Sequence, residues 1–155
     1  MKIYIMRHGQ AGMNAKTDEQ RPLTEQGIEE SLLMARWLAP QLTGRIDRVI
    51  HSNYLRARQT WQTICKELPD AVVVEESGDI TPYGDPAFVS SYLTALAERH
   101  QQIMLVSHLP LVGYLVQNLC PAAGAPMFAT SGIACIEWHN GKGSLLWLEG
   151  PHTIG

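Results

Sequence analysis

Residues 103–108 (IMLVSH) are the clearest core strand in this sequence, because four apolar residues run without interruption into a polar pair. A second apolar run, residues 3–6 (IYIM), stops at Arg7-His8-Gly9, where charge and a conformationally permissive glycine indicate a loop. Both predicted strands therefore deliver a histidine, His8 and His108, at the point where the strand ends.

Helical and strand-like patterns alternate around these two strands. Further strands are predicted at residues 48–52, 71–74, 133–138 and 144–148, and the last two resemble a hairpin around residues 140–143. Helices are predicted at about 24–40, 55–68, 85–99 and 111–118, from apolar spacing and capping residues. This alternation predicts an α/β three-layer sandwich, with a mostly parallel central sheet, helices on both faces and antiparallel strands at its C-terminal end.

The composition is that of one globular domain spanning residues 1–155. Apolar residues make up 45% of the chain and charged residues 17%, which permits dense packing and argues against disorder. A net charge of −3 gives no global reason to bind nucleic acid or an anionic membrane. We find no signal peptide and no apolar run long enough for a membrane span, so a cytoplasmic location is the default expectation.

The three cysteines do not suggest a disulfide framework or a zinc site. Cys65, Cys120 and Cys135 are odd in number and widely spaced, and they lack paired metal-type spacing. Buried free thiols are the expected state. No cluster of carboxylates suitable for a cation is found, and we expect neither a metal nor a cofactor.

Histidines and arginines gather where predicted strands end. Arg7 and His8 follow the first strand, Arg56 stands early in the helix after strand 48–52, and His108 follows strand 103–107. Sheets of this kind bind ligands outside the carboxyl ends of their strands. Each residue alone has an ordinary structural explanation, but their shared position predicts one site suited to a phosphoryl group.

Three motifs, in this order, resemble those of the histidine phosphatase superfamily, whose fold is phosphoglycerate mutase-like. They are Arg7-His8-Gly9, residues 52–60 (SNYLRARQT) and Ser107-His108, and they extend over most of the chain. The short length, without a large insertion, and the segments 81–85 (TPYGD) and 107–115 (SHLPLVGYL) are similar to the SixA-type phosphohistidine phosphatases. The resemblance implies a hydrolase acting on phosphohistidine in proteins.

The resemblance also implies a role for each site residue. His8 would attack phosphorus and carry the phosphoryl group, since neutral imidazole is a good nucleophile near neutral pH. We expect the phosphoryl group or the rest of the substrate to be bound by Arg7, Arg56, His108, Gly9 and Arg21. A protonated His108 is a hypothesis, because among arginines that form would have to be favoured by the bound anion.

No strong general acid is evident. Relatives in the superfamily carry a glutamate in a long insertion or an aspartate directly after the second histidine, whereas this chain has Leu109 there and no long insertion. Asp85 and Asp18 remain candidates, although the proline after Asp85 favours a helix cap. A missing acid suits a phosphoramidate substrate, because imidazole departs more easily than an alkoxide.

The expected partner is a phosphotransfer or phosphocarrier domain that bears phosphohistidine, with the protein itself a monomer or weak dimer. Met127 and Phe128 could contact such a partner, although core packing is the favoured interpretation. Two alternatives stay open, namely a phosphatase for small phosphate esters and a phosphohistidine-binding module without turnover. Retention of His8 argues against the module, which gains nothing obvious from a nucleophile.

Overall fold

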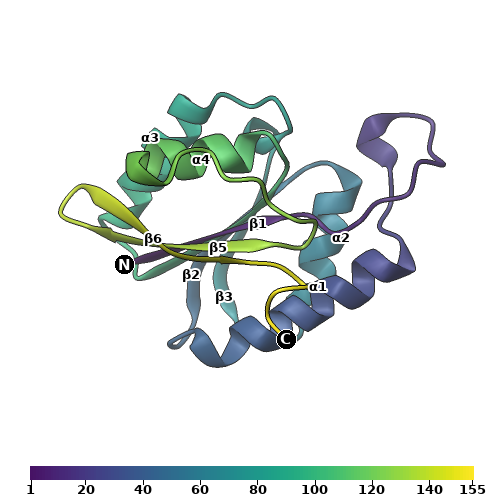
Figure 1. Cartoon of the computed structure of the whole chain (residues 1–155), viewed down its shortest axis with the longest axis horizontal. Coiled ribbons are helices and arrows are strands. Elements are labelled where there is room, and N and C mark those ends of the chain that lie inside the picture. The colour runs from purple at the N-terminus through teal and green to yellow at the C-terminus, as the bar shows by residue number, and fades with distance from the viewer.

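A six-stranded sheet forms the centre of the computed structural model, which describes all 155 residues (Figure 1). Its strands are β1 (Lys2–Arg7), β2 (Ile46–Ser52), β3 (Ala71–Ser77), β4 (Gln102–Ser107), β5 (Ile133–His139) and β6 (Lys142–Glu149). They lie in the order β3-β2-β4-β1-β5-β6. The pairs among β1 to β4 are parallel, whereas β5 is antiparallel to both β1 and β6. The predicted mostly parallel sheet with antiparallel strands at the C-terminal end of the chain is confirmed.

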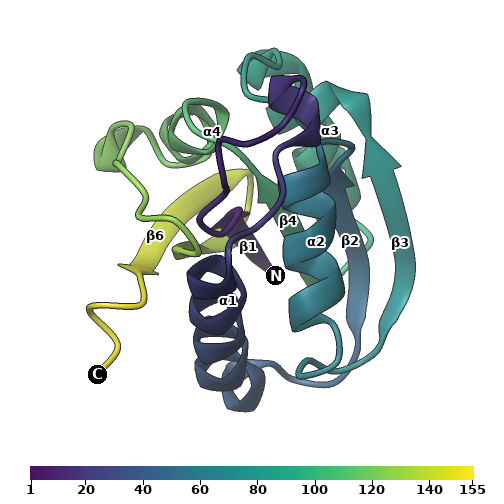
Figure 2. The same cartoon turned by 90° about the vertical axis from the view of Figure 1, so that its right-hand side faces the viewer.

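Helices cover both faces of this sheet (Figures 1 and 2). The helices are α1 (Glu25–Leu38) and α2 (Leu55–Ile64) on one face, and α3 (Pro86–Ala97) and α4 (Leu111–Leu119) on the other. Successive side chains of β1 alternate between the two cores, because a strand has a period of two residues. Ile3 and Ile5 pack with α3 and α4, while Tyr4 and Met6 pack with α1 and α2. The predicted three-layer sandwich is confirmed.

The interior position of β4 explains its uninterrupted apolar sequence. All six of its residues are buried, because β1 and β2 flank it and helices cover both of its faces. β3, in contrast, is an edge strand, and Val72, Val73 and Val74 remain exposed there.

Capping residues set the start of two helices as predicted. The Thr24 side chain accepts the Gly27 N–H, and the Asp85 side chain accepts N–H groups at the start of α3, where Pro86 is the first helical residue. The predicted end of α2 at residue 68 is wrong, since the helix ends at Ile64. Pro69 disfavours the helical conformation only at Leu68, and residues 65–67 before it already form a turn.

Parallel pairing brings the ends of β1, β2 and β4 to one edge of the sheet. Arg7 stands opposite Ser107, and the His8 N–H donates to the Ser107 carbonyl at 2.9 Å. β2 pairs with β4 on its other side and ends at Ser52. The backbone thus places His8, Ser52 and His108 together.

The three cysteines are free thiols. Cys120 and Cys135 are buried as expected, whereas Cys65, just beyond the last turn of α2, is partly exposed. None of the helices combines the length and the apolar character needed to cross a membrane.

Candidate functional site

A cavity of about 380 Å³ opens at the carboxyl ends of β1 and β4. Five of the six predicted site residues line it, namely Arg7, His8, Arg21, Arg56 and His108. The remaining lining residues are Gln10, Ala11, Asp18, Pro82, Tyr83, Leu109 and Thr130. The structure therefore joins segments that are more than a hundred residues apart in the chain.

His8 is held with one ring nitrogen bound and the other directed at Arg56. Its side chain lies 7% exposed, and Nδ1 is 2.7 Å from the Gly9 carbonyl oxygen. A carbonyl only accepts, so Nδ1 carries the hydrogen and Nε2 keeps its lone pair. The Arg56 Nε–H donates to that lone pair at 3.3 Å.

The surroundings of His8 favour its neutral form. Burial, with the charges of Arg56, Arg7 and Arg21, lowers the pKa of His8 to about 4, and the hydrogen bond to the Gly9 carbonyl only partly opposes this. At neutral pH the imidazole is therefore unprotonated at Nε2. A buried neutral imidazole beside three guanidinium groups has the chemistry of a nucleophile, at a position suited to an anion.

Gly9 supports His8 and does not line the cavity, in contrast to the expectation that it contributes to substrate binding. Its N–H donates to Thr60 Oγ1 at 3.0 Å, and its carbonyl accepts from His8. A Cβ at Gly9 would lie 2.7 Å from Ser31 Oγ and 2.9 Å from the Gly27 carbonyl oxygen. Glycine is needed here because this loop passes so close to α1.

Two arginines present their guanidinium groups to the cavity. Arg7 donates through Nη1 to the Phe128 carbonyl at 2.9 Å, while its buried Nε has no partner. Burial and then the charge of Arg56 lower the pKa of Arg7, but a guanidinium stays charged at neutral pH. Arg56, only 4% exposed, lies over the Tyr54 ring with its Cζ 5.0 Å from the ring centroid.

His108 is buried beside His8, with 5.0 Å between the ring centroids. Its Nε2 is 2.7 Å from Ser52 Oγ, and Ser52 Oγ also accepts the Tyr54 N–H at 3.1 Å. The Ser52 hydroxyl has no other acceptor, so its proton can be donated to His108 Nε2. In that arrangement Nδ1 carries the ring hydrogen, and this buried atom has no partner within the protein.

The surroundings of His108 within the protein favour its neutral form, and its protonation by a bound anion stays a prediction. Burial, followed by the neighbouring His8 and Arg56, lowers the pKa of His108 to about 2, so the imidazole is neutral in this structure. The unpartnered Nδ1–H makes protonation unnecessary for a donor role. A neutral His108 that accepts a hydrogen bond from Ser52 at Nε2 still has the Nδ1–H to donate.

The two candidate acids occupy different places. Asp85 caps α3 and does not line the cavity. Asp18, in a single 3-10 turn (Asp18–Gln20), lies in the site, with its carboxylate 3.1 Å from both Arg21 Nη1 and Arg56 Nη2. Its backbone carbonyl accepts from Arg56 Nη1 at 2.6 Å.

The carboxyl group of Asp18 is a poor proton donor. Burial acts to raise its pKa, but hydrogen bonds and charges from Arg21 and Arg56 outweigh this and lower it. The side chain is therefore ionised near neutral pH. Its contact with both arginines makes it a counterion of the site, and Asp85, which caps α3, lies outside the cavity, so neither candidate serves as a general acid here.

Sequence reasoning missed several contributors to the site. Ser52 and Thr60 lie at the two ends of the second motif, and Thr60 shares a helix face with Arg56 four residues earlier, so their spacing was a usable signal. Tyr83 and Thr130 come from loops, where no local sequence pattern indicates which side chains face a cavity. Met127 and Phe128 are the two residues considered as contacts for a protein partner. Phe128 is buried in the core, whereas Met127 is 79% exposed.

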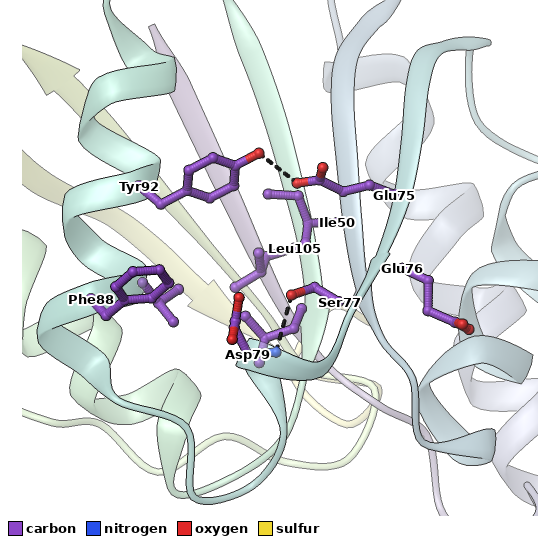
Figure 3. Close-up of a pocket in the computed structure, with 10 residues that line it drawn as sticks. Ile50, Glu75, Glu76, Ser77, Asp79, Phe88, Tyr92 and Leu105 are labelled. Carbon is purple, nitrogen blue, oxygen red and sulfur yellow. Dashed lines mark hydrogen bonds between the residues drawn. The ribbon is translucent and has the colours of Figure 1, made fainter.

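A second, smaller cavity of about 200 Å³ lies between β3 and α3 (Figure 3). Its ionisable groups include Glu75, Glu76 and Asp79, and no arginine, lysine or histidine lines it. The Tyr92 hydroxyl donates to Glu75 at 2.7 Å across it. An acidic lining disfavours phosphate, so this cavity is not a second phosphoryl site.

Comparisons with known proteins agree with the geometry. The family model of the histidine phosphatase superfamily (branch 1) matches residues 3–78. Phosphohistidine phosphatase SixA of Escherichia coli K12 is 45% identical, over 99% of this chain and 96% of that protein. The SixA homologue of Haemophilus influenzae is 34% identical, over 99% of this chain and 98% of its own. A solved structure of the protein histidine phosphatase SixA with tungstate superposes over all of both chains, with a TM-score of 0.94 and 43% identity.

Proposed function

The chain belongs to the histidine phosphatase superfamily, and we propose that it hydrolyses phosphohistidine on another protein through a covalent intermediate on His8. One observation carries the proposal. A neutral His8, with its Nε2 lone pair free of a proton, lies in a cavity whose cations are arginines and whose one carboxyl group, that of Asp18, is ionised. Relatives with high identity over nearly their full length are phosphohistidine phosphatases by name.

In the first step, His8 Nε2 attacks the phosphorus atom of the substrate. A new P–N bond forms to His8 while the P–N bond to the substrate imidazole breaks in line with it. The electron pair of the broken bond leaves with the substrate imidazole, which takes a proton from solvent at its departing or its distal nitrogen. His8 then carries the phosphoryl group, and its Nδ1–H stays bonded to the Gly9 carbonyl.

The arginines and His108 stabilise the charge on the phosphoryl oxygens during transfer. Arg7 Nε is a buried donor without a partner in the protein, and His108 Nδ1 is a second one when Ser52 donates to Nε2, so a phosphoryl oxygen would complete their hydrogen bonding. Arg56 contacts both His8 and Asp18, and its planar fork suits two oxygens at once. The tungstate held by the solved SixA relative is a tetrahedral oxyanion of the same kind as phosphate.

In the second step, water attacks the phosphorus atom on His8. The bond from phosphorus to Nε2 breaks, and inorganic phosphate leaves with the oxygen of that water. The pKa of about 4 makes the His8 imidazole a good leaving group in this step, because the protein favours its neutral form. The free enzyme is restored with His8 neutral.

The cavity offers no carboxylic acid that could protonate a leaving group, and this favours phosphoramidates over phosphate esters as substrates. Release of an alkoxide from a phosphate ester needs a proton donor, and Asp18 is ionised by its two arginines while Asp85 caps a helix. Imidazole needs no such help from the enzyme. We propose a phosphotransfer or phosphocarrier domain in the cytoplasm as the partner that supplies the phosphohistidine.

This reasoning predicts a steep dependence of the phosphorylation step on the leaving group. Phosphohistidine and aryl phosphates with acidic phenols should react at least about 100-fold faster than phosphoserine peptides, since general acid catalysis contributes at about that level or above. Single-turnover rates across aryl phosphates of graded phenol pKa, with a phosphoramidate and phosphoserine, measure this directly. A flat dependence would show that a general acid operates and would favour the small-ester alternative.

The pH profile of the same step should extend unusually far into acid. His8 must be neutral to attack, and lowering its pKa from 6.5 to about 4 keeps it neutral over that interval. The nucleophile is therefore lost as pH falls through about 4, not through 6.5. Nuclear magnetic resonance titration of the His8 ring checks the value, with His8→Ala used to assign the signal. A midpoint near 6.5 would contradict the prediction that burial controls this residue.

A further inference from the structure

We propose that Met13, Tyr83 and Met127 form an apolar rim on which the phosphohistidine-bearing protein docks. The inference rests on the proposed function and adds a recognition surface to it. The rim is distinct from the phosphoryl-binding groups, because its three residues contribute neither a charge nor a nucleophile.

These residues are outliers in exposure. Tyr83 is 90% exposed, Met127 79% and Met13 78%, whereas the next large apolar side chain, Phe88, is 59% exposed. Single exposed apolar side chains are ordinary on a protein surface. The three largest exposures, however, come from three separate segments that meet at one cavity.

One rim residue lines the cavity, and the other two each follow or precede a residue that binds an arginine of the cavity. Tyr83 lines it directly. Met13 follows Gly12, whose carbonyl accepts from Arg21 Nε at 3.0 Å. Met127 precedes Phe128, whose carbonyl accepts from Arg7 Nη1 at 2.9 Å. The segment that contains Met13 leaves β1 and protrudes from the molecule at the right of Figure 1, the side that faces the viewer in Figure 2.

The depth of His8 explains why the occupant would be a protein. His8 is only 7% exposed, so a phosphohistidine side chain must enter the cavity before its phosphorus meets Nε2. A histidine side chain is short, and the surface that carries it is then brought against the surroundings of the opening. A small phosphoramidate reaches the same atom without touching an exposed rim.

The chemistry of the rim suits such a partner. Methionine is flexible and polarisable, and it adapts to surfaces of different shape. Tyrosine combines a large apolar area with a hydroxyl and is enriched among residues that dominate binding energy. The rim can thus contact more than one folded carrier without specific charge pairing.

The test compares protein and small substrates in the double variant Met13→Asp/Met127→Asp. The matched control is Leu33→Asp/Leu146→Asp, whose two leucines are 47% and 49% exposed and do not line the cavity. The probes are phosphoramidate and a panel of phosphotransfer and phosphocarrier domains labelled with phosphate on histidine. We expect kcat/KM for at least one carrier to fall about 10- to 100-fold in the rim variant, as for loss of one or two binding hot spots. Phosphoramidate turnover should change less than about threefold, and the control should change neither.

The other outcomes separate failure of the rim from failure of the proposed function. If the wild-type protein hydrolyses carriers and the rim variant does so equally well, docking on the rim is wrong and the proposed function stands. An equal loss with phosphoramidate also contradicts docking, because it indicates disturbance of the phosphoryl site. Sedimentation that shows a wild-type dimer and a monomeric rim variant would assign the rim to a second copy. If no carrier is hydrolysed and aryl phosphates are, the proposed function itself is wrong.

Discussion

Replacement of His8 by alanine is expected to abolish turnover while leaving the fold intact. Removal of a catalytic nucleophile costs on the order of 10⁶-fold in rate when no other group can replace it. The side chain lies at a strand end and makes its own hydrogen bond to the adjacent Gly9 carbonyl, so the sheet does not depend on it. Steady-state rates with phosphoramidate, together with the circular dichroism spectrum and the melting temperature, measure both parts of this prediction.

The chain offers a matched control in His51. It has the same exposure as His8, 7%, and the same local hydrogen bond, from Nδ1 to the carbonyl of the next residue, Ser52. It does not line the cavity. His51→Ala should therefore retain activity within about tenfold while removing an equally buried imidazole.

Trapping of the intermediate distinguishes a nucleophile from a binding residue. Wild-type protein mixed briefly with labelled phosphoramidate and quenched without acid should carry the label on His8, and the alanine variant should carry none. Label on another residue, or normal turnover by His8→Ala, would refute the proposed mechanism.

Replacement of Arg56 by alanine is expected to lower kcat/KM by about 10²- to 10⁴-fold, the range seen when a charge donor directed at a transition state is deleted. Arg56 is 4% exposed and donates to His8 Nε2, so it sits where the phosphoryl group must pass. Arg56→Lys should recover only part of the loss, because an ammonium group lacks the planar fork.

Arg58 provides the control on the same helix. It lies two positions further along α2, is partly exposed, and pairs with Glu76 at 2.8 Å outside the cavity. Arg58→Ala should change kcat/KM less than about threefold. Inhibition by tungstate separates binding from folding, since Arg56→Ala should weaken it and Arg58→Ala should not. A loss below tenfold in folded Arg56→Ala would remove Arg56 from the site.

Much of the fold was predictable because its signals are local. The apolar runs of β1 and β4, the Thr24 cap and the Asp85-Pro86 start of α3 each depend on neighbouring residues in the chain. The end of α2 was predicted less well, because apolar spacing continues past Ile64 while the chain already turns toward Pro69. Local periodicity defines where an element lies better than where it stops.

The sequence by itself determined that two histidines and two arginines meet, because parallel strands bring their carboxyl ends to a common edge. Only the tertiary structure decided their protonation and their partners. The contacts of Arg56 with Asp18, of Gly9 with Thr60 and of His108 with Ser52 join residues 38, 51 and 56 positions apart. Such contacts depend on the path of loops and on burial by distant elements, which no local pattern records. They make Asp18 a counterion and allow His108 Nδ1 to donate, while burial and the nearby arginines keep His8 neutral, and these three states together favour phosphohistidine as the substrate.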